Sequence, residues 1–79
     1  MTDPEELATI IKRHRKAANL TQLELAELAG VGKTVVFDIE KGKETVKIQT
    51  LSKVLKVLNI EMRFTSPLLD NWNMENEKS

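Results

Sequence analysis

The sequence has 79 residues, enough for one small domain but not for a second core or a deep catalytic cleft. It contains no cysteine and one histidine, so disulfides and cysteine–histidine metal sites are excluded, and we expect helix packing and a second copy to supply stability. The formal net charge is zero, which argues against a protein that coats nucleic acid indiscriminately.

The first predicted helix begins at Asp3-Pro4-Glu5-Glu6, with Asp3 as N-cap, Pro4 in the first helical position and Glu6 closing a capping box. Apolar spacing extends it to about residue 18. The residues on its predicted apolar face are Leu7, Ile10, Ile11, His14 and Ala17 or Ala18. We therefore expect His14 in the core or at its rim, and most of the basic run 12–16 on a solvated face.

A second capping box at Thr21-Gln22-Leu23-Glu24 opens a short helix that stops at Gly30. Its predicted apolar residues are Leu23, Ala26, Leu28 and Ala29. A third helix begins near Lys33, buries Val36 and Ile39, and ends before Gly42, which can take positive φ. Two short helices joined by a tight glycine-containing turn are typical of a helix-turn-helix, here Thr21 to Gly42.

A fourth helix is predicted over 48–58, with Asn59 as its stop. Its predicted apolar residues are Ile48, Leu51, Val54, Leu55 and Leu58. Residues 60–65 then alternate apolar and polar side chains up to Ser66-Pro67, which predicts a strand. A lone strand is not stable, so we expect it to pair with the same strand of a second copy through Ile60, Met62 and Phe64.

Over residues 7–58 the sequence resembles the lambda-repressor-like, Cro/C1-type (Xre-type) helix-turn-helix family. The matching residues are Gln22, Ala26, Gly30, Val36, Ile39, Glu40 and Gly42. The resemblance implies a mainly α, four-helix lambda-repressor-like DNA-binding domain, here with a C-terminal β-strand pairing across a dimer. We assign residues 1–66 to that domain and 67–79 to a flexible acidic tail.

In this family the third helix lies in the major groove, so the resemblance assigns base reading to Lys33, Thr34, Val35, Phe37 and Asp38. Lys33 can donate to guanine, Thr34 can serve several bases, and Asp38 can accept from cytosine N4. Asp38 could instead be a surface carboxylate paired to a lysine. Phe37 departs from the smaller or polar residues commoner at its position, and either touches a thymine methyl group or packs inside the protein.

The same resemblance places Gln22, Lys41, Lys43 and Lys47 against DNA phosphates, where they set register rather than sequence. Arg15 and Glu40 match an ion pair that joins the first helix to the end of the third. We interpret that pair as structural, since losing one partner would leave a desolvated charge.

The segment Leu-Asn-Ile-Glu-Met-Arg-Phe at 58–64 resembles the antitoxin half of HipBA-type toxin–antitoxin pairs. That resemblance implies a dimer that binds inverted repeats in its own promoter and holds a HipA-like, kinase-like toxin. Leu68, Leu69 and Trp72 in the acidic tail could anchor such a partner, or Trp72 could fold back onto its own domain. A stand-alone or phage-type repressor, or a protein-interaction module, remains the alternative.

Catalysis is not expected from this sequence. Gly32-Lys33-Thr34 resembles the end of a phosphate-binding loop, but its leading glycine would fall at Glu27. His14 has no second histidine or cysteine with which to hold a metal, and no nucleophile is paired with a base, so we expect neither cofactor nor metal. The acidic N-terminus and the lack of a long apolar stretch predict a cytoplasmic regulator.

Overall fold

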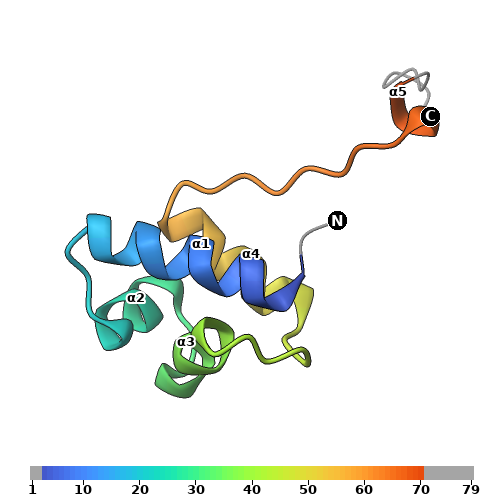
Figure 1. Cartoon of the computed structure of the whole chain (residues 1–79). Coiled ribbons are helices and arrows are strands. Elements are labelled where there is room, and N and C mark those ends of the chain that lie inside the picture. The colour runs from blue at the N-terminus through green and yellow to red at the C-terminus, as the bar shows by residue number, and fades with distance from the viewer. Residues whose placement is uncertain (1–2, 71–79) are drawn as a thin grey trace.

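The computed structural model describes residues 3–70, and the regular elements among these residues are all helices (Figure 1). In chain order the helices are α1 (Pro4–Ala17), α2 (Gln22–Ala29), α3 (Lys33–Glu40), α4 (Ile48–Val57) and α5 (Pro67–Asp70). Trp72 and the rest of the predicted acidic tail beyond residue 70 lie outside the described residues. Among the described helices, none is long and apolar enough to cross a membrane.

The predicted helix starts agree with the structure. The Asp3 side chain accepts a hydrogen bond from the Glu6 amide at 2.8 Å. At α2 the capping box is reciprocal, because Thr21 Oγ1 accepts from the Glu24 amide at 3.0 Å and Glu24 Oε1 accepts from the Thr21 amide at 2.8 Å. The start of α3 differs, since its N-cap is Gly32 and supplies no side-chain hydrogen bond.

The predicted helix stops are confirmed as left-handed backbone positions. Gly30 ends α2 with φ 69°, and Gly42 has φ 80° beyond α3. Asn19 and Asn59, with φ 59° and 57°, end α1 and α4 in the same way. Asparagine tolerates this conformation better than other residues with a side chain, which explains why it ends these two helices.

The core joins the first four helices, which Figure 1 shows packed around one centre. Its buried members are Ile11, Leu25, Ala26, Val36, Ile39, Val54 and Leu55. The predicted apolar face of α2 was partly wrong, since Leu23 and Leu28 are 50% and 63% exposed while Leu25 is fully buried. The side of α2 that faces the core carries Leu25 with Ala26 and Ala29, which follow it by one and four residues.

The predicted face of α1 also needs correction. Ala8, Ile11 and Arg15 form its buried stripe, whereas His14 is exposed and only its Nδ1 lies against the Ile10 carbonyl oxygen, at 2.7 Å. The stripe at i, i+3 and i+7 turns His14 out of the core. Similarly Ile48, predicted on the apolar side of α4, is 64% exposed in the first turn of that helix.

The predicted strand at 60–65 is not present in the described chain. After α4, residues 60–66, which we call the C-terminal arm, run without regular structure away from the helical body to α5 (Figure 1). Ile60 is held, since its amide donates to the Leu55 carbonyl at 2.9 Å, but Met62 and Phe64 are 38% and 71% exposed. A strand requires a partner backbone, and no described residue of this single chain belongs to a strand.

The first residues of the predicted tail form one helical turn. This turn is α5, Pro67–Asp70. Proline is favoured in the first turn of a helix because its missing amide proton has no partner there, which explains why the turn starts at Pro67. Leu68 in this turn is 70% exposed.

Candidate DNA interface

The third helix is fixed to the domain by one side and open on the other. Val36 and Ile39 are buried in the core, and α3 packs against both α1 and α2. Lys33, Thr34 and Phe37 are exposed and follow one another at helical spacing on the opposite side. The observed burial therefore agrees with the predicted core side of this helix and leaves three of the predicted base-reading residues exposed.

A hollow lies between the exposed faces of α2 and α3. It is lined by Gln22, Leu23, Lys33, Thr34 and Phe37, and we call it the α2–α3 hollow. Phe37 is 47% exposed and Leu23 50%, so the interpretation of Phe37 as a core residue is wrong. Val35, also predicted to read bases, is instead half-buried against the core cluster.

Lysines flank the exposed end of α3. Lys41 Nζ lies 5.0 Å from the centre of the Phe37 ring, within the range of a cation–π contact. Lys43 Nζ lies 3.4 Å from Asp38 Oδ2, so the alternative in which Asp38 pairs with a lysine agrees with the structure of the free protein. Lys47 is the N-cap residue of α4, and its side chain is exposed.

Glu40 at the end of α3 is the centre of a nearly buried polar network. Arg15 Nε and Nη2 donate to its two carboxylate oxygens at 2.6 Å and 2.9 Å, and Nη1 donates to the Leu20 carbonyl at 2.8 Å. Gln22 Nε2 donates to Glu40 Oε1 at 3.0 Å. The network ties α1 and the start of α2 to the end of α3, so it sets the orientation of the exposed helix.

The network includes two features that the sequence did not reveal. Gln22, predicted to contact phosphate, uses its amide group on Glu40. Lys12, assigned with its neighbours to a solvated face, lies close enough for its charge to act on Glu40. Lys12 precedes Arg15 by three residues, and that helical spacing was the available signal.

The charges in the network stabilise one another. Burial by itself would raise the pKa of Glu40, but hydrogen bonds from Arg15 and Gln22, together with the charges of Arg15 and Lys12, outweigh it and leave this pKa below its ordinary value. The hydrogen bond to Glu40 raises the pKa of Arg15. Both groups are therefore charged at neutral pH.

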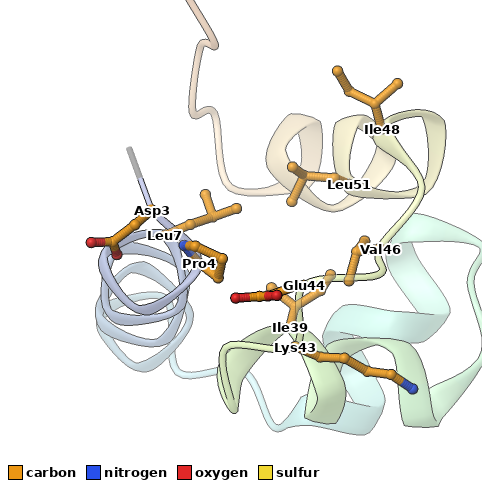
Figure 2. Close-up of a pocket in the computed structure, with 9 residues that line it drawn as sticks. All are labelled: Asp3, Pro4, Leu7, Ile39, Lys43, Glu44, Val46, Ile48 and Leu51. Atoms are coloured by element: carbon orange, nitrogen blue, oxygen red, sulfur yellow. The ribbon is translucent and has the colours of Figure 1, made fainter. Parts of the chain in front are cut away.

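A second hollow lies on a different part of the surface (Figure 2). It is formed by the first turns of α1 and α4 and by the end of α3 with the loop that follows. Its lining residues are Asp3, Pro4, Leu7, Ile39, Lys43, Glu44, Val46, Ile48 and Leu51. The sequence did not predict it. Within the described residues no cluster of His, Cys, Asp or Glu could hold a metal ion.

Two adjoining short helices, the second exposed along one side and flanked by cations, define a helix-turn-helix DNA-binding domain. The family model for the helix-turn-helix family HTH_3 matches residues 11–64, and the chain belongs to that family. It is a DNA-binding transcriptional regulator of the Xre type.

Relatives come from both bacteria and phages. The chain is 36% identical over 64 residues to the HTH-type transcriptional regulator y4mF of Sinorhizobium fredii, covering 81% of this chain and 84% of the relative. It is 34% identical over 62 residues to the ImmF control region 10 kDa protein of Bacillus phage phi105, covering 78% and 69%. Both matches cover more than two thirds of this chain and more than two thirds of the relative.

Solved structures share the fold. The HipB-O4 20mer complex matches with a TM-score of 0.75 and 25% identity, covering 85% of this chain and 94% of that chain. The master regulator for biofilm formation SinR, solved in complex with DNA, matches with a TM-score of 0.62 and 39% identity, covering 70% and 89%. The similarity to HipB covers more of this chain than the similarity to SinR does.

Proposed function

We propose that this regulator is a repressor that binds an inverted-repeat operator as a homodimer, by binding alone and without catalysis. The observation that carries the proposal is the exposed first turn of α3, where Lys33 and Thr34 are free of the core while Val36 and Ile39 fix the helix. Base edges in the major groove are read by donors and acceptors presented in this way.

The C-terminal arm supports the dimer. In the single chain Met62 and Phe64 are exposed apolar residues on an extended backbone, a combination that favours pairing with another backbone. The arm leaves the helical body on the side away from α2 and α3 in the view of Figure 1. Pairing of two arms around Ile60, Met62 and Phe64 would therefore leave both α3 helices uncovered.

We further propose that the chain is the antitoxin and autorepressor of a HipBA-type operon. The support is the fold similarity to HipB, which extends over most of this chain and includes the HipA-HipB-O2-O3 complex, at a TM-score of 0.75. The exposed Leu68 in α5 offers an apolar contact for a HipA-like partner. A stand-alone repressor is the second candidate, favoured by the identity to the phage phi105 control protein.

The first experiment is a selection of bound sequences from random duplex DNA at near-physiological salt, where non-specific binding is weak. We expect a palindromic motif whose half-site centres lie about 34 Å apart, one turn of DNA, or a multiple of that distance. Sedimentation analysis of the complex should give two chains per site. An asymmetric motif bound by one chain, or a folded protein that enriches no motif, would contradict the proposed function.

A second experiment separates the antitoxin from the stand-alone repressor. The gene next to this one is examined for a kinase-like product, which is then co-expressed with a tagged form of this chain. We expect the two products to purify together at a fixed ratio and the kinase-like product to be toxic when expressed alone. A neighbouring gene of another kind, or a kinase-like product that does not bind, would favour the stand-alone repressor.

A further inference from the structure

The α2–α3 hollow has an unusual composition for a surface that contacts DNA. Two large apolar side chains from different helices face solvent there, Leu23 from α2 and Phe37 from α3, each about half exposed. Lys33, Thr34 and the Gln22 amide complete the lining. Exposed apolar area of this kind favours a ligand that covers it, because the area is then removed from water.

The polar groups around the hollow narrow the choice of ligand. Lys33 contributes a cation, and Lys41 holds a second cation 5.0 Å from the Phe37 ring, so the surroundings attract an anionic polymer. The cation–π contact also favours the observed orientation of the Phe37 ring before any ligand arrives. The hollow is therefore a preformed apolar site with hydrogen-bond donors beside it, on the face that approaches DNA.

Thymine is the base whose major-groove edge matches this chemistry. It presents a 5-methyl group next to the O4 acceptor, whereas cytosine has no methyl group and presents an amino donor there. The Leu23 and Phe37 side chains can contact the methyl group while Thr34 or Lys33 donates to O4. A cytosine in the same place would leave the Leu23 and Phe37 side chains uncovered. It would also bring its amino donor against the donor of Thr34 or Lys33.

We propose that the α2–α3 hollow binds the 5-methyl group of a thymine in each half-site, and that Leu23 and Phe37 are the side chains that determine this preference. The inference rests on the proposed function, since it requires specific binding of duplex DNA. It adds α2 to the base-reading surface, because Leu23 lies outside the helix that the family resemblance assigns to reading.

The test replaces thymine by deoxyuridine, which lacks only the methyl group. Each thymine of the duplex recovered from the selection is replaced in turn, and the Kd is measured for the full-length protein and for Leu23→Ala, Phe37→Ala and Leu28→Ala. Leu28 is the matched control, since it is an exposed leucine of α2 that does not line the hollow. Thermal unfolding of each variant verifies folding, and Phe37→Gln, which replaces the apolar ring by a polar side chain, serves if Phe37→Ala is unfolded.

We expect one thymine per half-site whose replacement weakens binding about fourfold, the value of one buried methyl group. The full-length protein and Leu28→Ala should show this sensitivity, and Leu23→Ala and Phe37→Ala should lose it. If a motif is found but contains no such thymine, or if both hollow variants keep the sensitivity, the inference is overturned while the proposed function stands. If the selection recovers no motif, the proposed function is contradicted, and the inference that rests on it falls with it.

Discussion

Arg15 of α1 and Glu40 of α3 are joined by two hydrogen bonds across 25 residues of sequence, with side chains that are only 10% and 3% exposed. The pair is also bonded to the Leu20 carbonyl and to the Gln22 amide, so the described structure leaves no buried side-chain nitrogen or oxygen without a partner. A buried pair that is fully satisfied in this way constrains geometry more than it adds stability. Here the constrained geometry is the attachment of the reading helix to α1 and α2.

Removing one member of the pair should be costly. In Arg15→Met the Glu40 carboxylate keeps its burial but loses both arginine bonds, and we expect the free energy of unfolding to fall by about 3 kcal/mol. Urea unfolding followed by circular dichroism measures the change. In the double variant Arg15→Met/Glu40→Leu most of the loss should be recovered, because no buried charge remains. A single variant within about 0.5 kcal/mol of the parent would contradict the buried-pair interpretation.

The lowered pKa of Glu40 predicts the pH dependence of this contribution. Because the folded-state pKa lies below the ordinary value of 4.5, the unfolded chain takes up a proton at Glu40 first as the pH falls. The contribution is present above about pH 4.5 and is lost as the pH falls through the lower folded-state value. We expect the stability difference between the parent and Glu40→Gln to be constant near neutrality and to shrink below pH 4.5. A difference that grows with acidification would show the opposite sign of shift.

The fold was predictable to the extent that local chemistry determined it. The helix starts at Asp3 and Thr21 and the stops at Gly30 and Asn59 depend on neighbouring residues alone, and they are confirmed. Which leucines of α2 are buried depends on how that helix is rotated against its neighbours, and there the prediction failed. The predicted strand depends on a second backbone that a single chain does not contain.

In the candidate site, too, features that depend on local sequence were predicted and features that depend on tertiary packing were not. Helical spacing together with the family resemblance identified the exposed side of α3 and the Arg15–Glu40 pair. The sequence could not decide between two roles for Phe37 or for Asp38, because burial and the position of Lys43 follow from tertiary packing. The sequence identifies Leu23 only as one of the apolar residues of the second helix, and its observed exposure reveals the apolar wall on α2.

Asp38 and Lys43 should have separable effects on DNA binding. Lys43 is predicted to contact a phosphate, so for Lys43→Ala we expect weaker binding to all sequences and a slope of log K against log salt that is shallower by about one. Asp38→Asn should alter base preference, and it also releases Lys43 from the 3.4 Å pair, so binding to random DNA should strengthen. Lys53→Ala, an exposed lysine of α4 that lines neither hollow, is the control. Equal losses on specific and random DNA for both variants would refute the two roles.

The arm should control assembly without controlling folding. Phe64 is 71% exposed in the single chain, so Phe64→Asp should leave the helical body folded, as circular dichroism measures, while it shifts the protein from dimer to monomer in sedimentation analysis. Affinity for the inverted repeat should drop together with the dimer. Leu28→Asp is the matched control, since Leu28 is 63% exposed but lies on α2. A dimer unaffected by Phe64→Asp would place the interface elsewhere.

Of the three glycines, Gly30 and Gly42 should be destabilised by a side chain and Gly32 should not, because only Gly30 and Gly42 have a left-handed backbone. Gly30, with φ 69°, has nothing within 4 Å of an added Cβ, so Gly30→Ala should lose about 1 kcal/mol from left-handed strain alone. Gly42, with φ 80°, should lose a similar amount, since its Cβ would meet Glu5 atoms only at ordinary contact distances of 3.7 Å and 3.8 Å. Gly32, the N-cap of α3 at φ −66°, has an allowed conformation for any residue.

Gly32→Ser should therefore gain a few tenths of a kcal/mol, about the difference between glycine and serine caps. Urea unfolding of Gly30→Ala, Gly42→Ala and Gly32→Ser measures these changes in the free energy of unfolding. If Gly30→Ala and Gly32→Ser change the free energy of unfolding equally, the left-handed backbone at Gly30 does not limit which residues this turn accepts. If Gly30→Ala loses both stability and DNA affinity, the turn between α2 and α3 holds α3 in the position from which it is proposed to read DNA.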